Sequence, residues 1–206
     1  MSAIEDNDSS YWPELENRLF TDEGDSRLNA NWPRADEHVR IILGYERAVN
    51  LLFEQIVTFK AGSLDLIQFP FIFLRRHEIE LRLKELIQFG RALCNESSEA
   101  PKSHDLCKLW TEVRSLNQRL LCLDGAVGDD TMTERIQEFQ QWDSRATASR
   151  YPVVEPNVNC GDSINLIAFH KTSNEMALFL DCILESWKEL ESNENFGSER
   201  QRRGTA

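Results

Sequence analysis

One short stretch of the chain carries side chains that could act together on a charged substrate. Arg76, Glu80 and Lys84 follow one another at intervals of four residues, and His77 is next to the first of them. On a helix, residues four apart lie on the same face, so these groups would share one strip. A histidine that serves as a base, beside a cation that stabilises developing negative charge, could cleave a phosphodiester.

The same strip has a simpler interpretation as a ladder of ion pairs. An exposed Arg–Glu or Glu–Lys pair on a helix contributes only ~0.2–0.5 kcal/mol. At the edge of a buried seam, the same groups are held in a more specific geometry and cost more to leave unpaired. From composition alone, this structural interpretation is favoured over a polar pocket at a helix or subunit interface.

A zinc-hydrolase signature begins in this stretch but is not completed. His77 and Glu78 match the start of His-Glu-x-x-His, yet Leu81 stands where the second histidine is needed. The sequence also contains no phosphate-binding P-loop, no dinucleotide-binding glycine motif and no nucleophile elbow. We therefore expect no metal and no cofactor.

The elements that must position these residues are predicted to be helices. Apolar residues recur with helical periodicity in segments at about 36–59, 70–94, 104–123, 130–148 and 163–192. The sequence shows no strand-like alternation bounded by hairpin turns, so it predicts an all-α fold, an antiparallel bundle of about five helices. Pro70 suits the first turn of the second helix, and Ser103 can cap the third.

Three of the predicted helices have a marked inner face. On the first helix it comprises Val39, Ile42, Leu43, Ala48, Leu52 and Ile56. On the second it comprises Ile72, Ile79, Leu83, Leu86 and Gly90, where the glycine would let another helix approach closely. On the last it comprises Met176, Leu180, Ile183, Leu184 and Trp187.

Length and charge limit the organisation and the function. The 206 residues fit an acidic, partly ordered arm over 1–34, a helical domain over 35–191 and a disordered tail over 192–206. A formal charge of −12 argues against broad contact with nucleic acid, but allows a small basic cleft or a basic partner chain. With neither a membrane-spanning run nor a signal peptide in this sequence, we expect no membrane association and a cytoplasmic location.

Three short motifs, in this order, resemble those of the HEPN superfamily of small helical bacterial domains. They are Glu80 with Lys84, then His104-Asp105-Leu106, then Arg150-Tyr151-Pro152. The resemblance covers about residues 68–190. It implies a HEPN-like bundle from a bacterial defence or toxin–antitoxin system, acting as a ribonuclease or as an inactive relative.

Active members of the HEPN superfamily share an arginine–histidine motif that is missing from this chain. In those proteins an arginine is followed, after four to six intervening residues, by a histidine, and no histidine of this chain has an arginine at that spacing. The nearest approach, Arg34 to His38, is one residue too short. The favoured expectation is therefore an interaction or regulatory module without ribonuclease activity of its own.

Partners are expected on two grounds. HEPN relatives commonly pair through helices, and the second and last predicted helices are apolar over more than one stripe, as Leu74, Leu81 and Phe169 indicate. We expect a homodimer or a complex with another protein.

Two other functions stay open from the sequence. A divergent, metal-independent ribonuclease would use His77 or His104 as its base and Arg76 or Arg150 as its cation, if separate helices bring them together. A helical scaffold would instead bind a nucleotide, so RNA or a nucleotide is a further candidate ligand. The candidate site comprises Arg76, His77, Glu80, Lys84, His104, Asp105, Arg150 and Tyr151.

Overall fold

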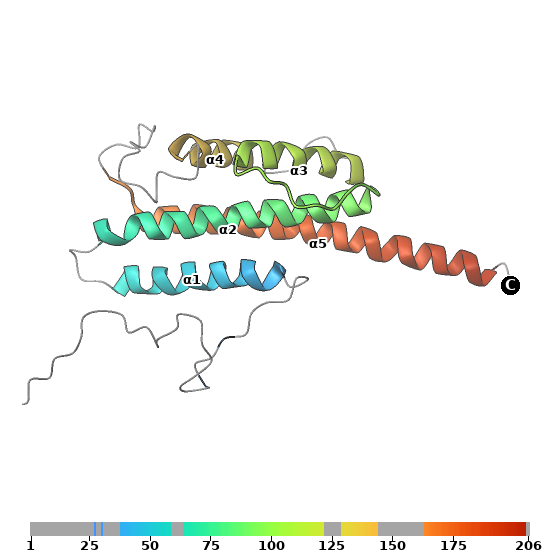
Figure 1. Cartoon of the computed structure of the whole chain (residues 1–206), viewed down its shortest axis with the longest axis horizontal. Helices are drawn as coiled ribbons and strands as arrows, with labels where there is room; N and C mark the ends of the chain where they lie inside the picture. The colour runs from blue at the N-terminus through green and yellow to red at the C-terminus, as the bar shows by residue number, and fades with distance from the viewer. Residues whose placement is uncertain are drawn as a thin grey trace, which may run out of the picture. The chain divides into compact units, whose positions relative to one another are not determined.

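The fold consists of helices throughout the part of the chain that can be described. The computed structural model describes residues 27, 30, 38–58, 64–121, 129–143 and 163–204, with side chains as far as residue 193. The helices are α1 (His38–Thr58), α2 (Leu64–Leu93), α3 (Leu106–Leu121), α4 (Asp129–Trp142) and α5 (Leu166–Gly204) (Figure 1). Since these ranges contain no strand, the predicted all-α fold of five principal helices is confirmed.

The chain divides into two compact units, Met1–Arg34 and Ala35–Ala206, and all five helices belong to the second. The expected acidic arm falls almost entirely outside the described residues. Helix α5 continues to Gly204, through most of the segment expected to be a tail, and from residue 194 only its backbone is described. Within the described ranges, none of the helices combines the length and the apolar content that a membrane crossing requires.

Helix α2 is the centre of the bundle. It packs against α1, α3 and α5, while α4 packs on α3 (Figure 1). Because neighbours cover α2 on several sides, it keeps no continuous polar face towards water. Its buried residues accordingly include charged ones, namely Arg75, Arg76, Glu78, Glu80 and Arg82.

Apolar residues gather in two clusters. The larger one joins α2, α3, α4 and α5 and includes Leu83, Leu109, Ile136 and Trp187. The smaller one joins α1, the first half of α2 and the start of α5, and its buried members are Val49, Ile56, Phe71 and Leu166. Helix α1 is thus held by a small core of its own, separate from the main one.

The inner faces predicted for the second and last helices are confirmed. All the residues named for them are buried in the structure. Gly90 is required at its position, because an added Cβ would lie 2.7 Å from Cζ3 of Trp187 on α5. This close approach lets the indole pack directly on the backbone of α2.

The inner face predicted for the first helix is partly wrong. Ile42 and Ile56 are buried as expected, but Val39 and Leu43 are each more than half exposed. The buried line is instead Ile42, Val49 and Ile56, at intervals of seven residues. Apolar residues occur on several sides of α1, so periodicity alone did not single out the side that α2 covers.

Three predicted helix ends also differ from the structure. Helix α2 begins at Leu64, so Pro70 lies inside the helix rather than in its first turn. Helix α3 begins at Leu106, and its cap is Asp105 rather than Ser103, since the Lys108 amide donates to Asp105 Oδ1 at 3.0 Å. Helix α4 ends at Trp142 instead of near residue 148, and residues 144–148 lie outside the described ranges.

Two of the three apolar residues used to predict a partner pack within this chain. Leu74 and Phe169 pack against the smaller core cluster, and Phe169 also borders the larger one. Leu81 is half-buried on α2. The large apolar side chains that are exposed are other residues, on α1, at the start of α2, and on and just before α5.

Candidate functional site

Two clusters of charged side chains surround α2. We call the first the Glu80 cluster; its members are Arg76, Glu80, Lys84 and His104. We call the second the Glu78 cluster; its members are Glu46, Arg75, Glu78, Arg82, His170 and Asp181. The first consists of predicted site residues, and none of the second was predicted.

The Glu80 carboxylate is the centre of its cluster. Its Oε1 lies 2.9 Å from Nζ of Lys84 and 2.8 Å from Nδ1 of His104. Its Oε2 accepts from Nη1 of Arg76 at 3.3 Å. Arg76 also donates from Nη2 to the main-chain carbonyl of His104 at 3.0 Å, so α2 is tied twice to the segment that opens α3.

Exposure changes steeply across this cluster. The side chains of Arg76 and Glu80 are each only 2% exposed, whereas that of His104 is 67% exposed. Lys84 is intermediate at 16%. The cluster therefore has a buried base and an open end at which water meets the imidazole.

Hydrogen bonding determines the ionisation of the central carboxylate. Burial would raise the pKa of Glu80, but hydrogen bonds from Lys84 and His104 outweigh it, so the pKa is lowered. Glu80 is therefore ionised at neutral pH. A negative carboxylate favours the His104 tautomer that carries its proton on Nδ1, which leaves Nε2 on the opposite side of the ring.

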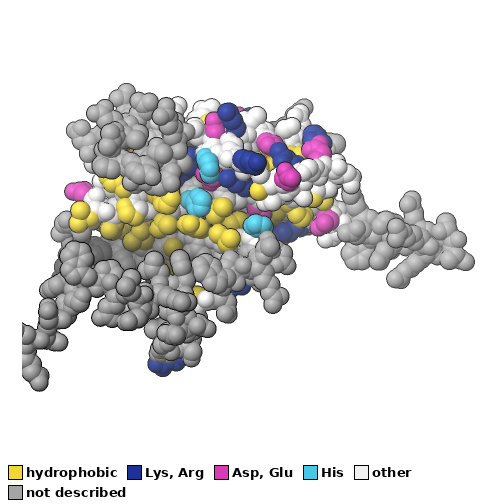
Figure 2. Space-filling model, viewed as in Figure 1, with side chains coloured by type: hydrophobic (Ala, Val, Ile, Leu, Met, Phe, Trp, Pro, Cys, Tyr) yellow, Lys and Arg dark blue, Asp and Glu magenta, His cyan; other side chains and the backbone are white. Residues whose placement is uncertain are grey.

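His77 stands beside this cluster in aromatic surroundings. Its ring is parallel to that of Phe73, with centroids 6.0 Å apart, and meets Tyr45 edge-on at 4.6 Å. Burial lowers the pKa of His77, and the nearby cations Lys84 and Arg76 lower it further. On the face drawn in Figure 2, apolar side chains form a band over α2 that histidine and Lys/Arg side chains border.

The remaining predicted site residues do not join this arrangement. Asp105 is accounted for by its role as the cap of α3, and its carboxylate is 3.9 Å from Lys108. Arg150 and Tyr151 lie outside the described residues. The structure thus brings together Arg76, Glu80, Lys84 and His104, with His77 adjacent.

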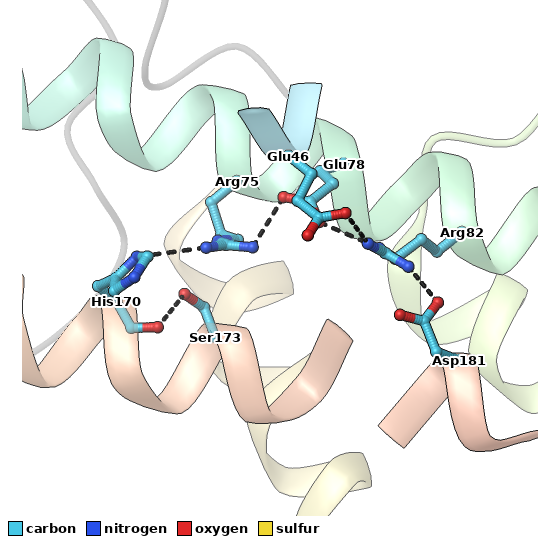
Figure 3. Close-up of polar contacts among 7 residues, drawn as sticks. All are labelled: Glu46, Arg75, Glu78, Arg82, His170, Ser173 and Asp181. Carbon is cyan, nitrogen blue, oxygen red and sulfur yellow. Dashed lines mark hydrogen bonds and ion pairs between the residues drawn. The ribbon is translucent and has the colours of Figure 1, made fainter. Parts of the chain in front are cut away.

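The Glu78 cluster links three helices through one arginine (Figure 3). Nε of Arg82 donates to Oε1 of Glu78 at 3.0 Å, within α2. Its Nη2 donates to Oε2 of Glu46 on α1 at 2.9 Å, and its Nη1 to Asp181 on α5. All three nitrogens of this guanidinium therefore have carboxylate partners.

The other end of this cluster joins a fully buried ion pair to a half-buried histidine. Arg75 and Glu78 are both fully buried and pair at 2.8 Å. Nη2 of Arg75 lies 3.2 Å from Nδ1 of His170, whose ring stacks on Phe53 of α1 with centroids 3.7 Å apart. Because the arginine can only donate, His170 accepts through Nδ1 and is neutral here. Nε of Arg75 is buried without a hydrogen-bond partner.

Burial dominates the ionisation of this cluster. It raises the pKa of Glu78, although Arg75 and Arg82 oppose the shift. It lowers the pKa of His170, and the neighbouring Arg75 lowers it further. The charged forms of the buried members of the Glu78 cluster, Arg75, Glu78 and Arg82, therefore depend on one another, whereas Glu46 and Asp181 also meet water.

Sequence reasoning missed the Glu78 cluster because nothing local marks it. Arg75, Glu78 and Arg82 are spaced like an ordinary exposed ion-pair series, and their burial depends on α1 and α5, which are distant in sequence. One signal was present: charged residues occur on every side of α2, so a helix at the centre of a bundle must bury some of them.

The chemistry open to the two clusters differs accordingly. The Glu80 cluster offers an exposed imidazole held by a buried carboxylate, which can accept or donate a proton. The Glu78 cluster offers no group free to react and serves to hold helices together. Among the described residues, no group of three or more His, Cys, Asp or Glu side chains is placed to hold a metal ion.

Comparison of the chain with protein-family models, with curated proteins and with solved structures found no match.

Proposed function

We propose that this chain is a HEPN-like helical interaction or regulatory module, a subunit of a bacterial defence or toxin–antitoxin system that does not cut RNA by itself. The observation that carries the proposal is the state of Arg76. Of the two arginines predicted to supply the cation for phosphodiester cleavage, Arg76 is the one that the structure describes, and it is buried.

Both terminal nitrogens of the Arg76 guanidinium already donate hydrogen bonds within the protein. Nη1 binds the Glu80 carboxylate, and Nη2 binds the His104 carbonyl. A phosphate would have to displace both partners and enter a region closed to water, at the cost of leaving Glu80 with one cation fewer. A pre-positioned cation at the developing phosphorane charge is what such catalysis needs, and Arg76 is not available for it.

The absence of the arginine–histidine motif points the same way. Membership of the HEPN superfamily and a place in a defence system rest on the three motifs quoted above, and are part of the proposal.

A second candidate, a divergent ribonuclease, is favoured by one specific contact. The 2.8 Å contact between Glu80 Oε1 and His104 Nδ1 resembles the carboxylate–imidazole pairs that hold a general base in position. Lys84, on the same carboxylate oxygen, is the cation nearest to water. In this alternative His104 would take the proton of the attacking hydroxyl and Lys84 would face the phosphate.

An RNA cleavage assay separates the two candidates. Full-length protein is incubated with a fluorescent RNA containing single-stranded and paired regions, and the products are resolved on a gel. We expect no cleavage above that of a mock purification. Cleavage by the wild type that is lost in His104→Ala, but kept in the neighbouring surface variant Lys108→Ala, would establish the enzyme instead. Melting temperatures of both variants confirm that they remain folded.

A further inference from the structure

Helices α1 and α5 meet along a seam that two contacts define. Phe53 of α1 stacks on His170 of α5, and Arg82 links Glu46 of α1 to Asp181 of α5 (Figure 3). Phe53 follows Glu46 in the chain whereas His170 precedes Asp181, so the two helices run antiparallel.

Several of the positions next to this seam, on its outer side, are apolar on both helices. At 100° per residue, they fall beside the seam residues and away from the buried faces. We call them the α1–α5 rim; its members are Val39, Leu43, Val57, Ile167 and Leu178. Each of the five side chains is more than half exposed. Single exposed apolar residues are common, but several along one seam indicate an interaction surface.

Carboxylates accompany the apolar rim. The side chains of Glu46 and Asp181 are about a third and nearly a half exposed, and Glu185 is mostly exposed and pairs with Lys188 at 2.8 Å. In the Glu78 cluster two guanidinium groups face three carboxylates, which leaves a formal charge of −1. Burial raises the pKa of Asp181, and the neighbouring Glu46 and Glu185 raise it further, against the effect of Arg82. The rim is therefore apolar with an excess of negative charge.

We infer that the α1–α5 rim binds an amphipathic helix of a partner protein, with lysine or arginine side chains placed to meet Glu46 and Asp181. Apolar anchors one turn apart on such a helix would pack on Leu43 and Leu178. The inference deepens the proposed function and rests on it, because it names the surface and the partner chemistry through which an interaction module would work. From Val39 to Val57 the rim follows eighteen residues of α1, a length of about 27 Å.

A second copy of this chain fits the rim less well. A two-fold contact through it would bring Glu46, Asp181 and Glu185 of one copy towards the same residues of the other. Like charges facing one another across an interface are destabilising, and the chain as a whole carries −12. A basic helix is attracted by the same carboxylates.

Synthetic helical peptides test this surface directly. Three labelled peptides share one apolar face and differ only in flanking residues, which are all lysine, all glutamine or all glutamate. Their binding to the full-length protein is measured by fluorescence anisotropy. We expect the lysine peptide to bind most tightly and the glutamate peptide least. The double variant Leu43→Ser/Leu178→Ser should weaken the binding of the lysine peptide by about tenfold or more.

A matched control keeps the test specific. The double variant Leu51→Ser/Leu66→Ser removes two exposed apolar side chains that lie outside the rim. It should change the affinity by less than about twofold, since neither residue borders the seam. Circular dichroism of both double variants should match the wild type, because all four substituted side chains are exposed.

Two outcomes would overturn the inference. One is equal binding of the three peptides, or a lysine peptide that is insensitive to Leu43→Ser/Leu178→Ser. The other is a dimeric mass by light scattering that becomes monomeric only in this variant, which would assign the rim to a second copy. Either outcome leaves the RNA assay untouched, so a chain that cuts no RNA keeps the proposed function and loses only this binding surface.

Discussion

The Glu78 and Glu80 clusters start from the same local pattern and end in different environments. Each begins with an arginine and a glutamate three or four residues apart on α2. Helices α1 and α5 contact the first pair and the segment that opens α3 contacts the second, so that both pairs are buried. The clusters differ in what the central carboxylate also binds: Glu78 binds a second buried arginine, whereas Glu80 binds His104, which is mostly exposed. Spacing on a helix thus predicts that charges will pair, and the neighbouring elements decide which further groups join the pair and whether those groups meet water.

This difference separates a structural role from a chemical one. In the Glu78 cluster the carboxylate and both guanidinium groups are removed from water, so each depends on the others. In the Glu80 cluster a buried carboxylate holds an imidazole at the surface. Among the described residues, His104 is therefore the candidate for any chemical activity, and Glu78 is the one expected to contribute most to the free energy of folding.

The substitution Glu78→Gln should have the largest effect. It keeps the shape of the side chain but leaves Arg75 and Arg82 close together and buried without their shared carboxylate. We expect a loss of about 3–5 kcal/mol in the free energy of unfolding, measured by urea denaturation. Glu138→Gln, which breaks an exposed pair with Arg135, is the control and should cost no more than about 0.5 kcal/mol. If Glu78→Gln and Glu138→Gln cost the same free energy of unfolding, Glu78 does not hold the two arginines in a buried cluster.

The substitution Glu80→Gln should cost less, about 1–3 kcal/mol by the same measurement. Lys84 and His104 can turn to water when the carboxylate charge is removed, and Arg76 keeps its bond to the His104 carbonyl. If this variant proves as unstable as Glu78→Gln, the distinction between an open and a closed cluster fails.

A fall in pH should weaken the structure through two half-buried histidines, His77 and His170. The pKa values of His77 and His170 are lowered, so below the ordinary histidine pKa of about 6.5 the unfolded chain binds more protons than the folded one. Stability from these groups is therefore complete above that pH and declines as the pH falls towards the folded-state pKa.

The variant His170→Gln isolates this effect. Glutamine can still accept from Arg75 but does not titrate, so stability should fall less steeply between pH 7 and 5.5 than in the wild type. The raised pKa values of Glu78 and Asp181 act in the opposite sense. The difference between variant and wild type, rather than either curve alone, is the measurement. Identical slopes would show that His170 is not a buried neutral acceptor.

The smallest effect is expected from His104→Ala. Its side chain is mostly exposed, and exposed ion pairs contribute about 0–1 kcal/mol, so the melting temperature should change little. A loss as large as that of Glu78→Gln would show that His104 is a structural residue. A stable variant keeps the RNA assay interpretable.

Much of the fold could be predicted from the sequence, because apolar periodicity is a local property. The inner faces of α2 and α5 were predicted correctly, since every residue named for them is buried. On α1 the same reasoning failed at Val39 and Leu43, where several sides are apolar and only the position of α2 decides which is buried. Leu74 and Phe169, which were used to predict a partner, pack within this chain, and the partner itself stays a prediction.

The candidate site was predictable only as far as its spacing is local. Arg76, Glu80 and Lys84 are spaced four residues apart on one helix, and their pairing follows from that spacing. The approach of His104 depends on how the loop before α3 folds back on α2. For Asp181 and the rest of the Glu78 cluster, the partners lie up to about a hundred residues away, as the separation of 99 between Arg82 and Asp181 shows.

Pro70 should affect how readily the first turns of α2 unfold locally. Proline has no amide hydrogen, so the carbonyl of Leu66 loses its donor, and the largely exposed position of that residue leaves the oxygen to water. The segment 64–69 is then joined to the remainder of the helix by one backbone hydrogen bond fewer than in an uninterrupted helix. Its amides should exchange with deuterium at the earliest time points, while the amides after Arg75 should stay protected. By its rates of hydrogen exchange, one continuous helix would then behave as two segments.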